Sequence, residues 1–203
     1  MTAAPQAWRD FMEQPVGYIH PDRLAKCFRG HVGPEFCAKL TGSGRLRRRL
    51  DEMIRLYYLL PDPDASHETA DERDLVIATA PPEALEAIVP RAGAIYWSAA
   101  IASAVRAADV AALQARIGEE LCTFAVRNRD LAAGGNALPS IETLGDRIMA
   151  SGWLCMAGWY DVLSPAIAAR VRLKLPPNAL FDAPLSEGYA EFAPEIVRRA
   201  ATG

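Results

Sequence analysis

An uncharged segment, residues 148–160, constrains the fold of this chain more than any other feature of its sequence. It reads IMASGWLCMAGWY, with two tryptophans, Trp153 and Trp159, and no Asp, Glu, Lys or Arg. A helix of this length is too short to cross a bilayer, which requires about 20 apolar residues. The segment is therefore expected to be a helix that is buried in the protein core or against a partner.

A second uncharged run, residues 92–105, has an arginine on either side. We expect the two runs to pack together as a buried central helix pair, covered by the amphipathic segment 109–131 with its polar side outward. Gly152 and Gly158 would allow a neighbouring helix to approach closely. Each glycine costs roughly 1 kcal/mol in helix propensity relative to alanine.

Helical spacing of apolar residues dominates the rest of the chain. In residues 45–60, for example, apolar residues recur three and four positions apart, whereas alternation with a period of two is scarce throughout. The sequence therefore predicts an all-α fold, a single domain over residues 1–203 with about seven to nine helices. It would comprise N-terminal helices in 1–60, an acidic connector in 61–80, and the main helical core with the C-terminal helix in 81–203.

Prolines set several of the expected helix boundaries. Pro21 and Pro165 stand where the first turn of a helix tolerates proline, and Pro90 should stop the short helix that begins at Pro82. Further helices are expected over about 5–14, 45–60, 109–131 and 185–200.

Residues 170–175 fit two structures. The alternation of Val171, Leu173 and Leu175 is compatible with a strand, but the alanines upstream favour a helix that continues to about residue 173.

The segment 61–74, PDPDASHETADERD, contains six carboxylates, one arginine and two prolines. Such a composition is typical of an exposed connector with at most a short helix. It does not separate two independent domains, because the residues before it carry too little apolar surface for a core of their own.

Charge and cysteine content exclude several classes of protein. The chain has 25 acidic and 22 basic residues and a net charge of −3, whereas a general nucleic-acid binder usually has a basic excess. The four cysteines form no C-x-x-C pair, which favours a reduced cytosolic protein over a disulfide-rich secreted one. No secretory signal or transmembrane-length segment is apparent, so we expect a soluble cytoplasmic protein that does not insert into membranes.

No catalytic or metal-binding pattern is evident. The sequence lacks a P-loop and a G-x-S-x-G. Cys27, His31 and Cys37 are close together, but structural zinc needs a fourth ligand and none is evident. We therefore expect no metal, no cofactor and no enzymatic activity.

The alternative of an enzyme stays open: a helical enzyme with a pocket between the uncharged helices. The two runs would offer it few polar groups: Tyr96, Ser98, Ser103, Ser151 and Tyr160.

Five arginines in residues 45–55 are the main candidate binding feature. Three interpretations of these arginines stay open. They form a solvated face paired with Asp51 and Glu52, they bind an acidic protein partner, or they contact nucleic acid as part of a regulator. The candidate partner-binding residues are Arg45, Arg48, Arg49 and Arg55, together with Trp8. Trp8 is included because tryptophan is enriched at interface centres and lies here in a short N-terminal helix.

Several segments resemble one protein family. They are the helix start Pro81–Leu85, the Ala92–Ala94 region, and above all residues 141–176, which end in Arg-Val-Arg-Leu-Lys-Leu-Pro. Gly17–His20 resembles the family's opening more weakly. The pattern is similar to the cytosolic accessory proteins of bacterial type III secretion, of the SctK/YscK type, over roughly residues 75–176.

The resemblance implies a cytosolic, mostly helical, non-enzymatic subunit of the sorting platform beneath the injectisome. Members of this family link the cytoplasmic domain of the inner-membrane ring protein (SctD type) to the cytoplasmic-ring protein (SctQ type) that carries the ATPase scaffold. The resemblance brings no catalytic residues and no nucleic-acid partner.

Overall fold

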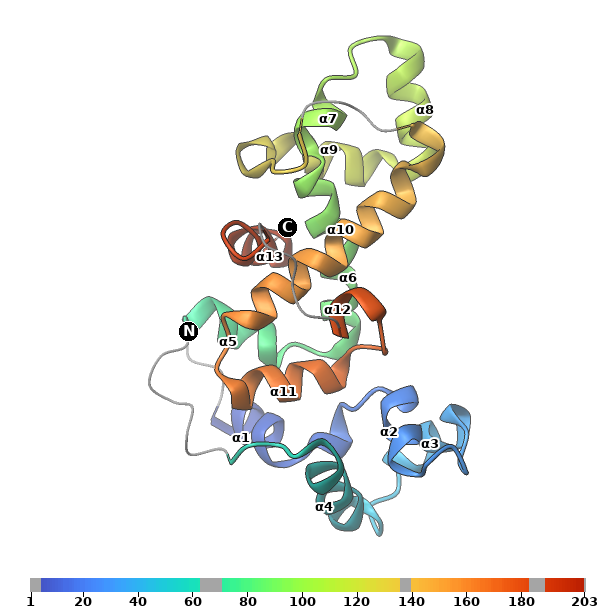
Figure 1. Cartoon of the computed structure of the whole chain (residues 1–203), viewed down its shortest axis with the longest axis vertical. Coiled ribbons are helices and arrows are strands. Elements are labelled where there is room, and N and C mark those ends of the chain that lie inside the picture. The colour runs from blue at the N-terminus through green and yellow to red at the C-terminus, as the bar shows by residue number, and fades with distance from the viewer. Residues whose placement is uncertain (1–4, 63–70, 136–139, 183–188, 203) are drawn as a thin grey trace. The chain divides into compact units, whose positions relative to one another are not determined.

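The computed structural model describes residues 5–62, 71–135, 140–182 and 189–202, and these residues form helices and no strands (Figure 1). The α-helices are α1 Pro5–Glu13, α2 Pro21–Cys27, α3 Pro34–Thr41, α4 Arg47–Tyr58, α5 Glu72–Thr79, α6 Pro82–Tyr96, α7 Ser98–Ala102, α8 Ala107–Ile117, α9 Glu119–Arg127, α10 Ile141–Asp161, α11 Pro165–Lys174, α12 Ala179–Asp182 and α13 Ala193–Ala201. Two short 3₁₀ turns, η1 Pro15–Gly17 and η3 Arg129–Leu131, complete the list. The all-α prediction is confirmed, and residues 170–174 are helical. None of the described helices is long and apolar enough to cross a membrane.

The helices are more numerous and shorter than expected, thirteen in the described residues against seven to nine. The predicted helix 109–131 is broken at Gly118, whose φ of 89° lies in a region that glycine enters without steric cost. The uncharged run 92–105 is divided between the end of α6 and the short α7.

Pro90 does not stop a helix, contrary to the prediction, but lies inside α6. A proline at this position removes one backbone hydrogen bond and costs about 3 kcal/mol. Val89 and Ala92, on either side of it, are fully buried, so tertiary packing keeps the helix continuous.

The second half of the predicted connector 61–80 forms the short helix α5, in which Asp74, Ile77 and Ala78 are buried rather than exposed. Residues 63–70 lie outside the described residues. So do residues 183–188, and the predicted last helix over 185–200 begins at Ala193.

The chain divides into two compact units, and the acidic connector 61–80 lies inside one of them rather than between them. Unit 1 combines residues 1–85 with 163–178, and unit 2 combines 86–162 with 179–203. Folding of the two units as a single domain stays a prediction.

Buried cations hold unit 1 together. Arg170 and Lys174 on α11 and Arg23 on α2 are only 1%, 2% and 3% exposed. Arg170 donates to the carbonyl oxygens of Met12 at 2.9 Å and Pro61 at 3.0 Å. Arg23 donates to the carbonyls of Leu175 at 2.6 Å and of Pro176 at 3.2 Å. Segments that are far apart in the sequence are thus joined through side chain to backbone bonds.

Lys174 makes the corresponding connection to α5. Its ammonium group donates to the carbonyls of Ala78 at 2.6 Å and Ala80 at 2.7 Å. It also lies 4.7 Å from the ring centroid of Phe11 and 5.1 Å from that of Tyr18, within cation–π range. Burial lowers the pKa of Lys174 to about 7.

Glycines set the packing of unit 2. A methyl group on Gly93 of α6 would overlap the carbonyl oxygen of Ile148, and one on Gly152 of α10 would overlap that of Val89. The indole N–H of Trp97 donates to the hydroxyl of Ser151 at 3.0 Å beside this crossing. The expected packing of the two uncharged runs is confirmed, and so is the role of Gly152.

Gly158 has the predicted role as well, towards α13. A Cβ atom there would lie 2.6 Å from the Cβ of Ala193. Of the tryptophans in this helix, Trp159 is fully buried, whereas Trp153 is half-buried with its ring centroid 6.0 Å from that of Phe181.

We expect Arg170→Met to lower the free energy of unfolding by about 3 kcal/mol, because the carbonyl groups of Met12 and Pro61 lose their donor. Urea denaturation followed by circular dichroism measures this. Arg147→Met, at an exposed position of α10, is the control and should change stability by less than about 0.5 kcal/mol. Equal effects of the two changes would contradict the role of Arg170.

Lys174 should make stability depend on pH. Its pKa in the folded protein, about 7, is lower than the ordinary 10.5, so above pH 7 the unfolded chain binds more protons and the free energy of unfolding rises with pH. Urea denaturation between about pH 6 and 7.5, below the range in which the cysteines of the unfolded chain lose their protons, should show this rise. Lys174→Met should be less stable and lack the rise, and an unchanged slope in this variant would assign the pH dependence to other groups.

Gly152→Ala should destabilise the protein by about 2 kcal/mol, because overpacking against backbone exceeds the gain in helix propensity. Gly145→Ala in the same helix is the control. A Cβ atom at Gly145 meets only the flexible Arg116 side chain, at 3.6 Å, so this change should stabilise by about 0.5–1 kcal/mol. If both substitutions raise the free energy of unfolding in urea denaturation, the crossing of α6 and α10 has space for a methyl group at Gly152.

Candidate partner-binding surfaces

The predicted arginines lie on one side of α4, opposite the core. Leu50 and Ile54 of this helix are buried in the core of unit 1. Arg45, just before the helix, and Arg48, Arg49 and Arg55 are exposed. Residues three and four positions apart share a helix face, so the four predicted arginines form one basic surface.

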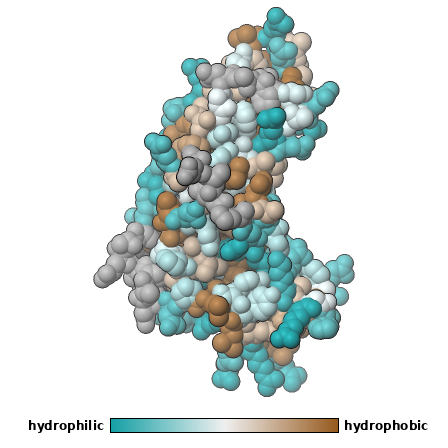
Figure 2. All heavy atoms as spheres, viewed as in Figure 1, coloured by the Kyte–Doolittle hydropathy of each residue, from teal (hydrophilic) through white to brown (hydrophobic). Residues whose placement is uncertain are grey.

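Two exposed leucines continue this surface at the C-terminal end of α4. Leu56 is 75% exposed and Leu59 is 83% exposed. Figure 2 shows hydrophobic atoms at the surface over α4, among hydrophilic ones. We call Arg45, Arg48, Arg49, Arg55, Leu56 and Leu59 the outer face of α4.

Leu59 is also held in an unfavourable backbone conformation. Its φ of 49° and ψ of 47° are left-handed, and its N–H caps the helix by donating to the carbonyl of Arg55. This conformation costs a residue with a side chain roughly 1–2 kcal/mol and usually selects glycine. Unit 1 therefore presents a large apolar side chain to solvent at a position where glycine would be more stable, which is typical of a binding surface rather than of a folding requirement.

The arginines differ in how firmly they are held. Arg55 donates to the carbonyl of Glu13, and Arg48 lies 3.7 Å from Glu52 in the expected ion pair. Arg45 and Arg49 make no hydrogen bond or ion pair with the residues that the structure describes. These two guanidinium groups are the most readily available to a partner.

The expected pairing of Asp51 with an arginine of its own helix is wrong. The Asp51 carboxylate is buried and accepts the backbone N–H of Val16 at 2.8 Å. Burial raises the pKa of Asp51, and the hydrogen bond from Val16 and the nearby Arg55 oppose this shift. Asp51 thus fastens α4 to η1, and it forms no ion pair with Arg45, Arg48 or Arg49 in the described residues.

Trp8 is half-buried on α1. Its ring centroid lies 5.8 Å from that of Phe11, which in turn lies 5.5 Å from that of Tyr18. Packing within unit 1 accounts for this tryptophan, and its assignment to a partner stays a prediction.

The cysteines and His31 do not form a metal site of the usual kind. The described residues contain no group of three or more His, Cys, Asp or Glu side chains that could hold a metal ion. Burial raises the pKa of Cys27 to about 11 and also raises that of Cys37. Both thiols are therefore protonated at neutral pH and suited to packing.

The alternative of an enzyme pocket between the uncharged helices finds no space at their crossing. A methyl group at Gly93 or at Gly152 would overlap a backbone carbonyl group of the other helix. The hydroxyl of Ser151, one of the few polar groups there, accepts the Trp97 indole N–H. This crossing serves packing.

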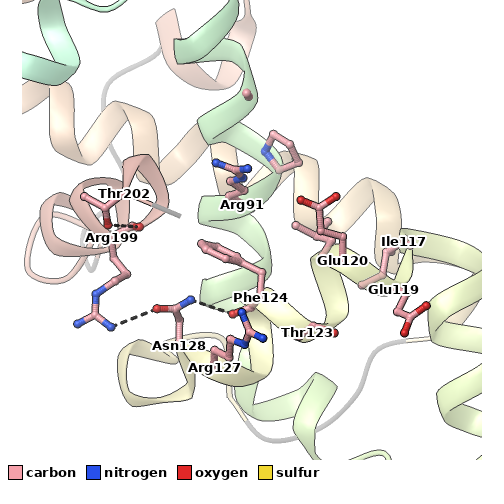
Figure 3. Close-up of a pocket in the computed structure, with 14 residues that line it drawn as sticks. Arg91, Ile117, Glu119, Glu120, Thr123, Phe124, Arg127, Asn128, Arg199 and Thr202 are labelled. Carbon is pink, nitrogen blue, oxygen red and sulfur yellow. Dashed lines mark hydrogen bonds between the residues drawn. The ribbon is translucent and has the colours of Figure 1, made fainter.

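Sequence analysis missed a groove on unit 2 (Figure 3). It has a volume of about 1150 Å³ and lies among α6, α9 and α13. Its lining residues are Ala87, Pro90, Arg91, Ile117, Gly118, Glu119, Glu120, Leu121, Thr123, Phe124, Arg127, Asn128, Arg199 and Thr202. We call it the α9 groove. The sequence feature that could have indicated this groove is the spacing of Glu120, Phe124 and Arg127, which share one face of α9.

Comparison with known protein families found a match to one family. Residues 7–192 match the model of a family described as YOP proteins translocation protein K (YscK). Searches of curated proteins and of solved structures gave no match.

Proposed function

The chain belongs to the YscK family of type III secretion proteins, and we propose that it acts there as a non-enzymatic adaptor between two other proteins. One partner is the cytoplasmic domain of the inner-membrane ring protein (SctD type), and the other is the cytoplasmic-ring protein (SctQ type). The protein would work in the cytoplasm, docked at the inner membrane through the secretion apparatus.

The outer face of α4 carries this proposal. Its arginines favour an acidic partner, and its two exposed leucines require that the partner also offer apolar surface. Residues 20–60 hold nine basic and four acidic side chains, a net charge of +5 in a chain whose total is −3. Such a separation of charge steers association with an acidic protein and sets the orientation of the complex.

The leucines favour a protein over nucleic acid as the occupant of this face. A phosphate backbone would engage the arginines but would leave Leu56 and Leu59 in water. An acidic protein surface with an apolar centre satisfies both kinds of side chain.

Charge reversal on this face tests the proposal. We expect the triple variant Arg45→Glu, Arg48→Glu and Arg49→Glu to fold normally, because all three side chains are exposed. It should bind one of the two partners at least about tenfold more weakly and with little salt dependence. Isothermal titration calorimetry with the SctD-type domain and the SctQ-type protein of the same organism, at two salt concentrations, measures both effects.

The control makes the same change in net charge elsewhere, at exposed Arg9, Arg106 and Arg147, and should bind as the unmodified protein does. If the unmodified protein binds neither partner, the adaptor role is rejected. If the triple variant binds both partners normally, only the assignment to α4 is rejected. Salt-dependent binding of the unmodified protein to DNA or RNA, lost in the triple variant, would instead support the alternative of a regulator that contacts nucleic acid through these arginines.

Leu59→Gly separates binding from folding at the same face. Glycine enters the left-handed region without cost, so this variant should be more stable by about 1 kcal/mol in urea denaturation. It should nevertheless bind the same partner more weakly, because the apolar contact is lost. A variant that is more stable and binds normally would show that Leu59 lies outside the interface.

A further inference from the structure

The α9 groove has opposite charges at its two ends. Glu119 and Glu120 stand at the N-terminal end of α9, and Arg127 stands at its C-terminal end. Glu120 and Arg127 are two turns apart, or about 10 Å along the helix. The side chains between them are mostly apolar or uncharged, and Leu121 and Phe124 form part of the lining.

Three guanidinium groups from three different helices line the groove. Arg91 comes from α6, Arg127 from α9 and Arg199 from α13 (Figure 3). The guanidinium of Arg91 lies 5.7 Å from the ring centroid of Phe124, within cation–π range. Arginines from three separate helices in one groove, with an aromatic ring beside one of them, favour a ligand with carboxylate groups and an apolar body.

Arg199 is positioned by a buried amide. The side chain of Asn128 is buried, donates to the carbonyl of Phe124 at 2.8 Å and accepts from Arg199 at 3.1 Å. Asp130 lies 3.4 Å from the same guanidinium group. Arg199 is therefore fixed before any ligand binds, which lowers the entropic cost of using it. Arg127 makes no hydrogen bond or ion pair with the part of the chain that the structure describes.

The spacing of opposite charges along the groove favours a protein segment. The volume of the groove, about 1150 Å³, lies slightly above the usual 300–1,000 Å³ of small-molecule pockets and leaves room for such a segment. Helices commonly carry acidic residues in the first turn and basic residues in the last, because these charges complement the helix dipole. Laid antiparallel to α9, such a helix would bring its acidic turn to the arginines and its basic turn to Glu119 and Glu120.

We propose that the α9 groove binds an amphipathic helix of a partner protein, antiparallel to α9. This helix would have acidic residues in its first turn, an aromatic or branched apolar side chain in the middle that packs on Phe124, and basic residues in its last turn. The groove would be a binding surface separate from the outer face of α4, and its occupancy does not depend on the proposed adaptor role.

A display library of random peptides of about 16 residues, selected on the immobilised full chain, tests this directly. The retained peptides should be helical, with Asp or Glu at the start, apolar residues spaced three and four apart, and Lys or Arg at the end. Arg127→Glu and, separately, Thr123→Trp, which fills the groove, should each weaken these peptides by at least about tenfold.

Reversing the charge at the acidic end of the groove completes the test. Glu119→Lys with Glu120→Lys should also weaken the retained peptides, whereas Arg147→Glu on α10 should leave their affinity unchanged. Circular dichroism verifies that each variant is folded. Retained peptides without the acidic start, or peptides that bind every variant equally, would overturn the proposal. It would also be overturned by self-association of the full chain that Arg127→Glu abolishes, because a second copy would then be the occupant.

Discussion

Hydrogen bonds from buried cations to backbone carbonyl groups are the interaction on which unit 1 depends. In the described residues, Arg170 and Lys174 have carbonyl oxygens as hydrogen-bond acceptors rather than carboxylates. Removing a charge from water is costly, and it is tolerated only when every donor finds an acceptor in good geometry. One helix thereby holds Met12, Pro61 and the end of α5.

This arrangement gives a physical reason for the segment that most resembles the secretion family. In Arg170–Pro176, the cations alternate with Val171 and Leu173, which are buried as well. The helix ends at Lys174, before two prolines that cannot continue it, and this leaves the carbonyls of Leu175 and Pro176 available to Arg23. Two basic residues of this segment, Arg170 and Lys174, thus contribute to the core of unit 1.

Unit 2 is constrained instead by close packing between helices. The crossing of α6 and α10 leaves no room for a side chain at Gly93 or Gly152, so neither helix can rotate or slide without a clash. This rigid crossing carries the α9 groove, whose lining comes partly from α6. Binding surfaces on rigid elements hold their side chains in place at low entropic cost. We propose the exposed leucines of α4 and the arginines of the groove as two binding surfaces, one in each unit.

The sequence by itself determined the helical class, the starts of α2 and α11, the extent of α4 and the buried pairing of the two uncharged runs. These features follow from local rules: apolar periodicity, proline geometry and the absence of charge. The family was also accessible from the sequence, through the segment that ends at Pro176. Tertiary structure alone decided that α6 continues through Pro90, that Asp51 bonds to Val16, and that Arg170 and Lys174 are buried. In each case the deciding group is supplied by a part of the chain at least 30 residues away, and no local pattern reports such a partner. The exposed leucines of α4 and the α9 groove could not be predicted from the sequence for the same reason, since the exposure of a side chain and the shape of a surface depend on which parts the remaining helices cover.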